Sequence, residues 1–350
     1  MNVILNLQII FIVFLYIVKI DGACTLPTLL DGNWWDSRTA TVTITQSTGA
    51  ITGWSFTAYS NTISAFTCVE SDSSHWLFKA DSTVAAFGLN YFGYFCVRYT
   101  KISDYSYYYY LDSDTEAQAA NLRITMVAES SAASATISST CSPTSGPGTE
   151  ELHVLVKENQ QANVKQWFPE ALLGVYEYSV TDSSTTTCGS GSVWDGCTNR
   201  TTVNFNYTQC STEMFGSTTG ELYATYYVTS GTTNYVILLN GDSTTSTRFT
   251  CLAVSGTDVS SNPGSCEAGQ TATSRTSDAS SVTISLTAYE TCPFTTSTAA
   301  SPAFTTSPAA SPTSSAALIA GVVVVLLIVI ALLLLAYYKY KTKKWFRRKC

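Results

Sequence analysis

Histidine and charged residues are scarce in this chain of 350 residues. Only 12% of the residues are charged, and the two histidines are His75 and His153. No serine lies in the G-x-S-x-G pattern of hydrolases, and no C-x-x-C pair typical of zinc sites occurs. Because acid–base catalysis and metal binding draw on such residues, we expect no catalytic residue, no metal and no cofactor. The enzymatic alternative is a hydrolase that uses the two histidines as bases.

Both ends of the chain carry long apolar segments. Residues 1–23 are mostly apolar and end in small residues, which is typical of a secretory signal peptide. Residues 316–338 combine an uninterrupted apolar run, Ala316–Ala336, with two tyrosines, and a helix of this length crosses a bilayer. Residues 339–350 are rich in Lys and Arg and have no acid, which keeps this tail cytoplasmic. The pattern predicts a type I single-pass protein of the plasma membrane, with the intervening residues outside the cell.

The residues between these two apolar segments are acidic. Of the 18 Lys and Arg residues, seven lie in the tail and one in the signal segment, whereas all 25 acids precede the stalk. Because Asp21 lies in the signal segment, the extracellular part carries 10 basic and 24 acidic residues, a net charge of −14, which repels nucleic acids. The charge excludes nucleic acid as a partner and leaves an extracellular protein or glycan as the expected ligand.

Ten of the eleven cysteines lie in the extracellular part, and Cys350 lies in the tail. An even number of cysteines in a secreted chain predicts disulfides. The linker 142–150 separates a group of four from a group of six, so each group is able to close its own bridges, with three and fifteen connectivities possible. The predicted disulfide cysteines are Cys24, Cys68, Cys96, Cys141, Cys188, Cys197, Cys210, Cys251, Cys266 and Cys292.

Two segments carry the composition of glycosylated protein. Asn199 and Asn206 each lie in an N-x-Thr sequon, which predicts N-glycosylation. Asn206 follows an alternation of apolar and polar residues, which is expected to turn it toward solvent. Residues 294–315 are almost entirely Ser, Thr, Pro and Ala without charge, a composition that suits an O-glycosylated stalk.

A short pattern occurs twice in the chain. The segments "PTLLDGNWWDS" from Pro27 and "PEALLGVYEYS" from Pro169 share P-x-x-L-x-G-x-[W/Y]-x-x-S without a gap. Proline and glycine shape a turn, and the aromatic residue begins a strand that packs onto a core. The repetition predicts two modules, 24–141 and 151–293.

The rest of each module favours β-structure. Short runs rich in β-branched and aromatic residues are bounded by Gly, Asn, Asp and Ser, as in "TATVTITQ", "YFGYFCVRY", "YVILLN" and "RFTCLAV". Asn240-Gly241 is a strong hairpin signal, and Ser113 with Glu116 forms a capping box that predicts one helix. The expected fold is all-β: two disulfide-bonded antiparallel modules, each a barrel or a sandwich, plus the C-terminal transmembrane helix.

Two resemblances to known proteins accompany these motifs. Gly32-Asn33-Trp34 and Ser103-Asp104-Tyr105 resemble the G-x-W and [T/S]-D-Y motifs of lipocalins, with degenerate versions at Gly174-Val175-Tyr176 and Thr233-Asn234-Tyr235. The order of modules, clustered cysteines, stalk and membrane helix looks like invertebrate extracellular proteins, prominent in molluscs and annelids, that carry serial domains of unknown function. The first resemblance implies a barrel that binds a small hydrophobic ligand, and the second implies only an architecture.

An immunoglobulin sandwich is the alternative fold for the first module. Cys68, Trp76 and Tyr94-Phe95-Cys96 mimic its Cys…Trp…Tyr-x-Cys signature, although the two cysteines are too close for the intervening strands.

A run of tyrosines is the candidate ligand-binding feature. In a strand, Tyr105, Tyr107 and Tyr109 share one face, while Tyr108 and Tyr110 share the other. Tyrosines on both faces fill a core or form an aromatic recognition surface for proteins or glycans. The sequence thus predicts a non-enzymatic surface protein for recognition or adhesion, with a membrane-tethered lipocalin-like binder as the alternative.

Overall fold

The computed structural model describes residues 24–292 except 183–184, 187, 189–190, 207–208, 211–214, 216–219 and 243–246. The predicted signal peptide, the stalk, the transmembrane run Ala316–Ala336 and the basic tail lie outside the described residues. In the described part of the chain, no helix has the length and apolar character needed to span a membrane. The described residues all belong to one compact unit, Met1–Pro293.

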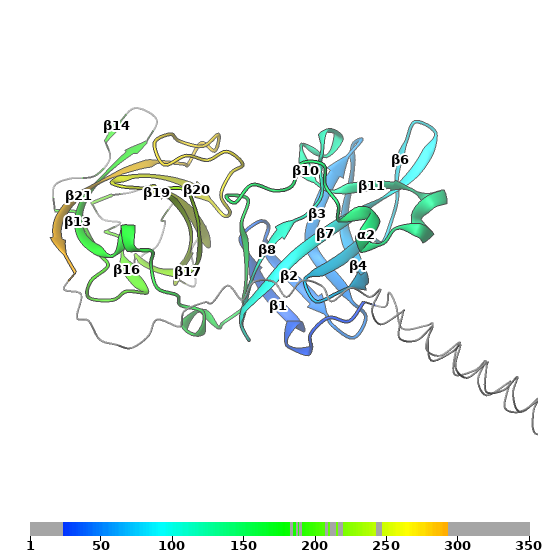
Figure 1. Cartoon of the computed structure of the whole chain (residues 1–350), viewed down its shortest axis with the longest axis horizontal. Helices are drawn as coiled ribbons and strands as arrows, with labels where there is room; N and C mark the ends of the chain where they lie inside the picture. Colours follow the sequence, from blue (N-terminus) through cyan, green and yellow to red (C-terminus); the bar gives the residue numbers. More distant parts are fainter. Residues whose placement is uncertain are drawn as a thin grey trace, which may run out of the picture. The chain divides into compact units, whose positions relative to one another are not determined.

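The first sheet closes into a barrel of antiparallel strands (Figure 1). Each strand pairs with the next along the chain, and the last pairs with both the first and the preceding one. This up-and-down order is the architecture found in lipocalins. The strands of the ring are β1 (Gly32–Asp36), β2 (Ala40–Thr45), β3 (Ala50–Ala58), β4 (Asn61–Ser71), β5 (His75–Ala80), β7 (Leu89–Ser103), β8 (Ser106–Leu111) and β12 (His153–Lys157).

Short strands and helical turns connect or flank the strands of the first barrel. They are η1 (Thr28–Leu30), β6 (Val84–Ala86), β9 (Thr115–Glu116), η2 (Ala117–Ala119), β10 (Leu122–Arg123), β11 (Thr125–Ala128), η3 (Glu129–Ser134) and α2 (Ile137–Thr140). The helix predicted after Ser113 is wrong, since the segment forms β9 and one turn of 3₁₀ helix. Glu116 caps that turn by accepting a hydrogen bond from the Gln118 amide, and the left-handed Ala120 ends it. The predicted capping box does not form, because Glu116 is itself the N-cap of this turn and the Ser113 hydroxyl accepts a hydrogen bond from Thr125 instead.

The second sheet is also antiparallel and barrel-like (Figure 1). Its strands are β13 (Gly174–Asp182), β14 (Thr185–Thr186), β15 (Val193–Asp195), β16 (Thr202–Asn204), β17 (Glu221–Ser230), β18 (Thr233–Asn240), β19 (Phe249–Ser255), β20 (Asp258–Pro263) and β21 (Thr283–Thr291), preceded by η4 (Gln161–Asn163) and η5 (Glu170–Leu172). β21 returns to pair with β13, and β13 also pairs with β15. Among the described residues β15 and β16 do not pair, so this ring is not closed by hydrogen bonds.

Each barrel has its own apolar interior. Every strand of the first ring contributes to one buried cluster, whose largest side chains include Trp34, Trp54, Trp76, Phe66, Phe78, Phe95, Tyr107 and Tyr109. The interior of the second barrel is mainly aliphatic, with Val236, Leu238, Leu252 and Ile284 as examples. The all-β, disulfide-bonded fold predicted from the sequence is thus present.

A third buried cluster joins the outer faces of the two barrels. Val154 and Val156 of β12 meet Ile237 and Leu239 of β18 there. β12 and β18 are therefore buried on both faces, which explains why "HVLVK" and "YVILLN" are continuous apolar runs rather than alternating ones. The predicted boundary of the second module at residue 151 needs correction, because β12 completes the first barrel.

Five disulfides join ten cysteines of the described residues, and each lies within one of the two predicted groups. The pairs are Cys24–Cys68, Cys96–Cys141, Cys188–Cys210, Cys197–Cys292 and Cys251–Cys266. The immunoglobulin alternative is wrong, because Cys68 and Cys96 bond to other partners and the sheet closes on itself.

The predicted turn at Asn240-Gly241 joins β18 to β19, but as a longer connection. The Asn240 amide donates to the carbonyl of Arg248, so the hairpin is closed around residues 241–247 rather than around two residues.

Candidate functional site

The tyrosine run lies mostly in buried positions. Tyr107 and Tyr109 point into the first barrel and are at most 1% exposed. Tyr110 and the half-buried Tyr108 belong to the cluster between the barrels, where Tyr108 stacks on Tyr226 with ring centroids 4.2 Å apart. Only Tyr105, at the β7–β8 turn, is exposed. Strand alternation therefore distributes these rings between two cores and does not gather them into a recognition surface.

Tyr109 is tied to a buried carboxylate inside the first barrel. Asp36 accepts hydrogen bonds from the Tyr109 hydroxyl at 2.9 Å and from the Trp54 indole at 2.7 Å. Burial, with the nearby Asp36 carboxylate, raises the pKa of Tyr109 well above its usual value. The phenol therefore stays protonated as a donor, which is a structural role.

His153 lies at the contact between the barrels. Its Nδ1 is 2.6 Å from the hydroxyl of Ser265, which also lies 2.8 Å from the Ser37 hydroxyl. Burial, with a contribution from the Arg38 charge, lowers the pKa of His153 to about 3. Because Ser265 is buried and the imidazole is so weak a base, the pair is suited to joining the barrels rather than to activating a nucleophile.

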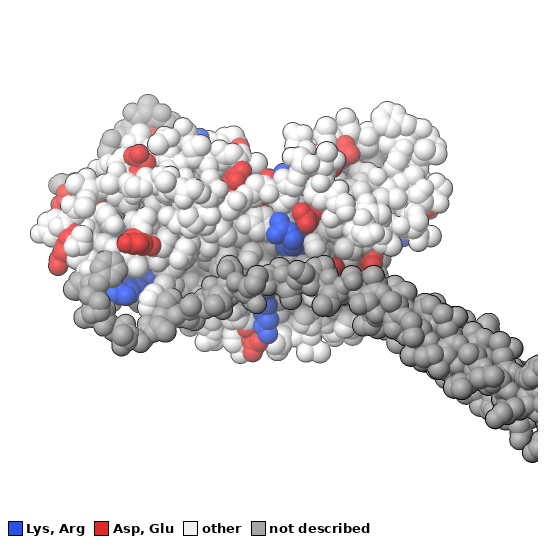
Figure 2. All heavy atoms as spheres, viewed as in Figure 1, with Lys and Arg blue, Asp and Glu red and all other residues white. Residues whose placement is uncertain are grey.

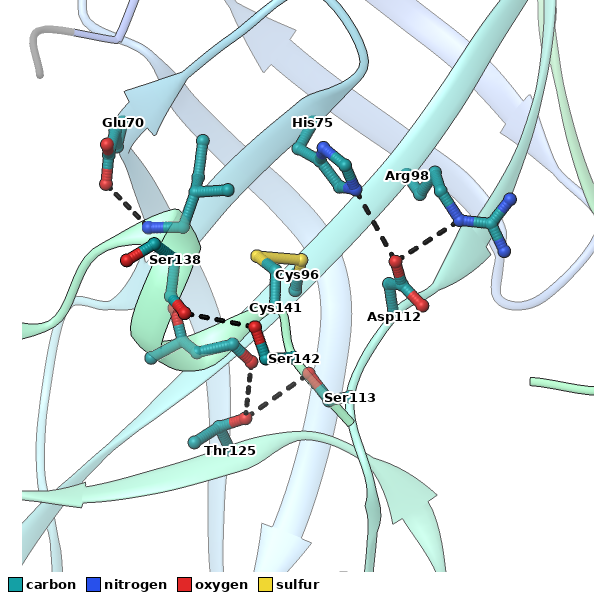
Figure 3. The surroundings of a disulfide bond; sticks show 12 residues. Glu70, His75, Cys96, Arg98, Asp112, Ser113, Thr125, Ser138, Cys141 and Ser142 are labelled. Carbon is teal, nitrogen blue, oxygen red and sulfur yellow. Dashed lines mark hydrogen bonds and ion pairs between the residues drawn. A yellow bond between two sulfur atoms is a disulfide. The ribbon is translucent and has the colours of Figure 1, made fainter. Parts of the chain in front are cut away.

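His75 lies on the outside of the first barrel, near the Cys96–Cys141 disulfide (Figure 3). Its Nε2 is 3.4 Å from Asp112, which also accepts from Arg98 at 3.2 Å, and its Nδ1 is 3.3 Å from Asp72. Asp72 is engaged in addition by the backbone amides of Ser74 and His75. The carboxylates around His75 are thus occupied in ion pairs and turn hydrogen bonds, and the described residues contain no group of three metal-ligating side chains.

The repeated pattern builds the same start in both barrels. Pro27 and Pro169 each precede a 3₁₀ turn, Leu30 and Leu172 are buried, and the glycine of the pattern begins the first strand. In the first barrel, the Trp34 indole donates to the Leu30 carbonyl at 2.7 Å. In the second barrel, the indole that donates to the Leu172 carbonyl at 3.1 Å comes from Trp194 of β15.

The end of the first barrel next to η1 is filled. Leu26, Leu30 and Trp34 are all buried there. Lys157 of the last strand covers this end, with its ammonium 5.0 Å from the Trp34 ring centroid and bonded to the Asp31 carbonyl. Burial of the Lys157 side chain in this position lowers the pKa of its ammonium.

The corresponding end of the second barrel carries a pocket of about 490 Å³. We call it the mouth pocket, and its lining residues are Pro169, Glu170, Ala171, Tyr227, Thr229 and Asn234. Strand alternation from Val236 in the interior cluster places Asn234 on the inner face of β18. Thr229 is paired with Asn234 across the hairpin, and Tyr227 shares the face of Thr229. The pocket is therefore the outer continuation of the barrel interior, with η5 on one side.

Several polar groups of the mouth pocket have no partner among the described residues. Thr229 donates its hydroxyl to the side-chain oxygen of Asn234 at 2.8 Å, which leaves the two N–H groups of that amide unpaired. Glu170 is exposed at the start of η5, and its carboxylate is likewise unpaired in the described part. Tyr227 is 37% exposed. An aromatic face, a hydrogen-bond acceptor and a hydrogen-bond donor thus lie around one hollow.

A β-bulge explains why the sequence pattern does not predict the inward orientation of Tyr227. Simple alternation along "ELYATYYV" places Leu222, Ala224 and Tyr226 on one face. The register instead shifts between Ala224 and Tyr226, and the extra Thr225 donates to the Ile237 carbonyl. The shift turns Tyr227 toward the inner face, a change that alternation alone cannot predict. Glu170 occupies a variable position of the repeated pattern, so the pattern does not predict a binding role for it.

The two predicted glycosylation sites lie in the second barrel. Asn199 is exposed, and its side chain accepts from the amide of Thr201. Val203 and Phe205 are buried and Asn204 is exposed, so the predicted alternation holds to that point. Asn206 follows β16 and is half-buried, with its amide side chain donating to Gln209 at 2.9 Å.

Comparison with protein families shows a match in the second barrel. Residues 171–301 are similar to a family described as Domain of unknown function (DUF7042). The match covers less than half of the chain and begins within η5, so it takes in most of the second barrel. Comparisons with curated proteins and with solved structures yield no match. The resemblance to serial-domain proteins of molluscs and annelids remains an expectation.

Proposed function

We propose that the chain is a type I single-pass glycoprotein of the plasma membrane whose extracellular part is a non-catalytic recognition protein. Support for the location comes from the two apolar end segments and from the five disulfides, which persist in an oxidising exterior. Charged side chains are scattered among uncharged ones on the face shown in Figure 2.

The observation that carries this proposal is the mouth pocket of the second barrel. The first barrel is filled by its own aromatic side chains, whereas the mouth pocket leaves a ring and unpaired polar groups open to a ligand. Concave sites with a few convergent polar groups are the usual places of ligand binding. Catalytic use is disfavoured because neither histidine lines the pocket.

Cells expressing the full chain with an epitope tag inside segment 294–315 test this function. We expect antibody staining of intact cells and adhesion of these cells to wells coated with purified extracellular matrix proteins or polymer-linked sugars. A Glu170→Gln/Tyr227→Ala variant should adhere less, and Tyr289→Ala, which changes a 75% exposed ring on β21, should adhere like the wild type. Staining only after permeabilisation, or adhesion unchanged in the mouth variant, contradicts the proposal.

A small hydrophobic ligand inside the first barrel is the second candidate. The closed ring favours it, as do two buried polar atoms without a partner, the Trp76 indole nitrogen and the Tyr107 hydroxyl. The aromatic filling opposes it, because a ligand would have to displace rings that are at most 2% exposed. Quenching of tryptophan fluorescence by a fatty acid, saturating at one equivalent, would support this candidate, and its absence would remove it.

A further inference from the structure

We infer that the mouth pocket binds an uncharged sugar residue of a glycan. The inference rests on the proposed function and names the ligand class of that site. The exposed ring, the hydrogen-bonding groups and the charge of the lining together favour this ligand class.

The ring of Tyr227 offers a partly exposed aromatic face at the edge of a pocket of about 490 Å³. A pyranose has one face of C–H groups and a rim of hydroxyls, so it is apolar and polar at once. Tyrosine is suited to such ligands because its ring is a rigid apolar surface that loses little conformational entropy on binding. Pro169 and Ala171 extend the apolar part of the lining on the η5 side.

The polar groups of the lining complement hydroxyls. A sugar hydroxyl donates one hydrogen bond and accepts others, so it is best bound between an acceptor and a donor. Glu170 supplies the acceptor. The Thr229–Asn234 hydrogen bond at 2.8 Å fixes the amide with its oxygen engaged, so Asn234 presents its N–H groups as donors.

The charge of the lining separates this ligand from its competitors. The lining holds one carboxylate and no Lys or Arg, which disfavours phosphate, sulfate and acidic sugars. Glu170, Thr229 and Asn234 make the pocket too polar for a lipid chain, whose binding would leave these groups unpaired. A cationic side chain suits the carboxylate and the ring, but not the amide N–H donors of Asn234. An uncharged sugar uses all three kinds of group.

Binding of defined sugar polymers to the full chain, purified in detergent and immobilised on a biosensor, tests the inference. The probes are polyacrylamide carrying galactose, glucose, mannose or N-acetylglucosamine, with polylysine as the cationic probe. We expect at least one sugar polymer to bind, about tenfold more weakly to Tyr227→Ala and to Asn234→Ala, a change equivalent to about 1.4 kcal/mol. Tyr227→Phe keeps the ring and should bind nearly as the wild type. Tyr289→Ala is the matched control for an exposed tyrosine. Glu170→Ala removes the acceptor at an exposed residue and keeps the test decisive if Tyr227→Ala unfolds.

The outcomes separate the ligand class from the proposed function. Failure of every sugar polymer to bind, or binding by both Glu170→Ala and Asn234→Ala equal to that of the wild type, overturns the sugar assignment. Binding of polylysine that depends on Glu170 but not on Asn234 also overturns it and assigns a cationic protein segment. In each of these cases, mouth-dependent cell adhesion to matrix proteins would leave the recognition function standing. If neither sugar binding nor cell adhesion depends on the mouth pocket, the proposed recognition function is also wrong.

Discussion

The two barrels begin with the same sequence pattern but are completed by different means. The first barrel closes by hydrogen bonds between β12, β1 and β8 and fills its interior with large rings. In the second, β15 and β16 do not pair with each other among the described residues, and the interior is mainly aliphatic. The Cys197–Cys292 disulfide spans 95 residues of the second barrel. Among the described residues, the first barrel is thus the more completely hydrogen-bonded ring, and the mouth pocket lies at one end of the second.

Removal of Cys197–Cys292 is the most severe way to test this comparison. In the chain-entropy account, a disulfide that closes a loop of 95 residues stabilises the fold by about 4–5 kcal/mol. Among the described residues, the second ring lacks β15–β16 hydrogen bonds that would compensate for the loss of this disulfide. Hydrogen exchange of the Cys197→Ala/Cys292→Ala variant should show lost protection in β13–β21 and retained protection in β1–β8. The matched control is Cys24→Ala/Cys68→Ala, a pair 44 residues apart. That control should lower stability but leave the closed first ring protected. Equal loss in both barrels would contradict the comparison.

Replacement of Trp34 in the first barrel or Trp194 in the second should cause the next largest losses of stability. Trp34 and Trp194 are both buried and donate to the carbonyl of the leucine in their 3₁₀ turn. Each change to alanine should lower the free energy of unfolding by about 3–5 kcal/mol, measured by urea titration. Tyr176, which matches Trp34 in the repeated pattern, is half-buried and donates only to Ala171. Tyr176→Ala should therefore cost about 1–2 kcal/mol. If Tyr176→Ala destabilises the protein as much as Trp34→Ala does, then Tyr176, and not Trp194 of β15, is the counterpart of Trp34 in the second barrel.

These examples also mark what the sequence predicts and what it does not. The strands "TATVTITQ", "YVILLN" and "RFTCLAV" and the separation of the disulfides into two groups follow from composition and spacing. They do so because burial and pairing are encoded locally. β12 was assigned to the wrong module because its partners β1 and β8 are far away in the sequence. The helix expected after Ser113 failed because strand pairing overrides a capping signal.

The candidate site is harder to predict from the sequence than the fold. The tyrosine run attracted attention by composition, yet its members Tyr107 and Tyr109 are core residues. Tyr227 and Asn234 meet in the mouth pocket only because of the bulge at Thr225 and the β17–β18 hairpin. A bulge depends on tertiary packing and has no reliable signature in a single sequence.

Acid should act on the first barrel and its contact with the second, because both histidines lie there. The pKa of His153 is about 3 in the folded chain and 6.5 when exposed. Between these values the unfolded chain binds the additional proton, so the free energy of unfolding falls as the pH falls. The slope is at most about 1.4 kcal/mol per pH unit, or about 2 kcal/mol lost at pH 5. Above pH 6.5 this group has no effect.

Urea titrations at pH 7 and pH 5 measure this dependence. His153→Asn keeps a polar partner for Ser265 but has no titrating group, so it should lose less stability between the two pH values than the wild type. The control is His75→Asn, which removes the exposed-face histidine from its ion pairs with Asp72 and Asp112. An identical pH dependence in His153→Asn and the wild type would show that His153 is not the acid-sensitive group.

The hairpin turns provide the smallest and most direct comparison. In the first barrel the β3–β4 turn places Tyr59 and Ser60 at φ of 49° and 64°, a conformation that costs L-residues about 1 kcal/mol. In the second barrel the β17–β18 and β19–β20 turns use Gly231 and Gly256 at 58° and 59°. Ser60→Gly should therefore raise the free energy of unfolding by about 0.5–1 kcal/mol, because it relieves strain and the Ser60 side chain has no partner among the described residues. Gly231→Ala should lower it by a similar amount, since nothing lies within 4 Å of the added Cβ and only the backbone strain changes. Thermal unfolding of the two variants beside the wild type gives the signs, and a destabilising Ser60→Gly would mean that the flexibility of glycine in the unfolded chain outweighs the relieved strain.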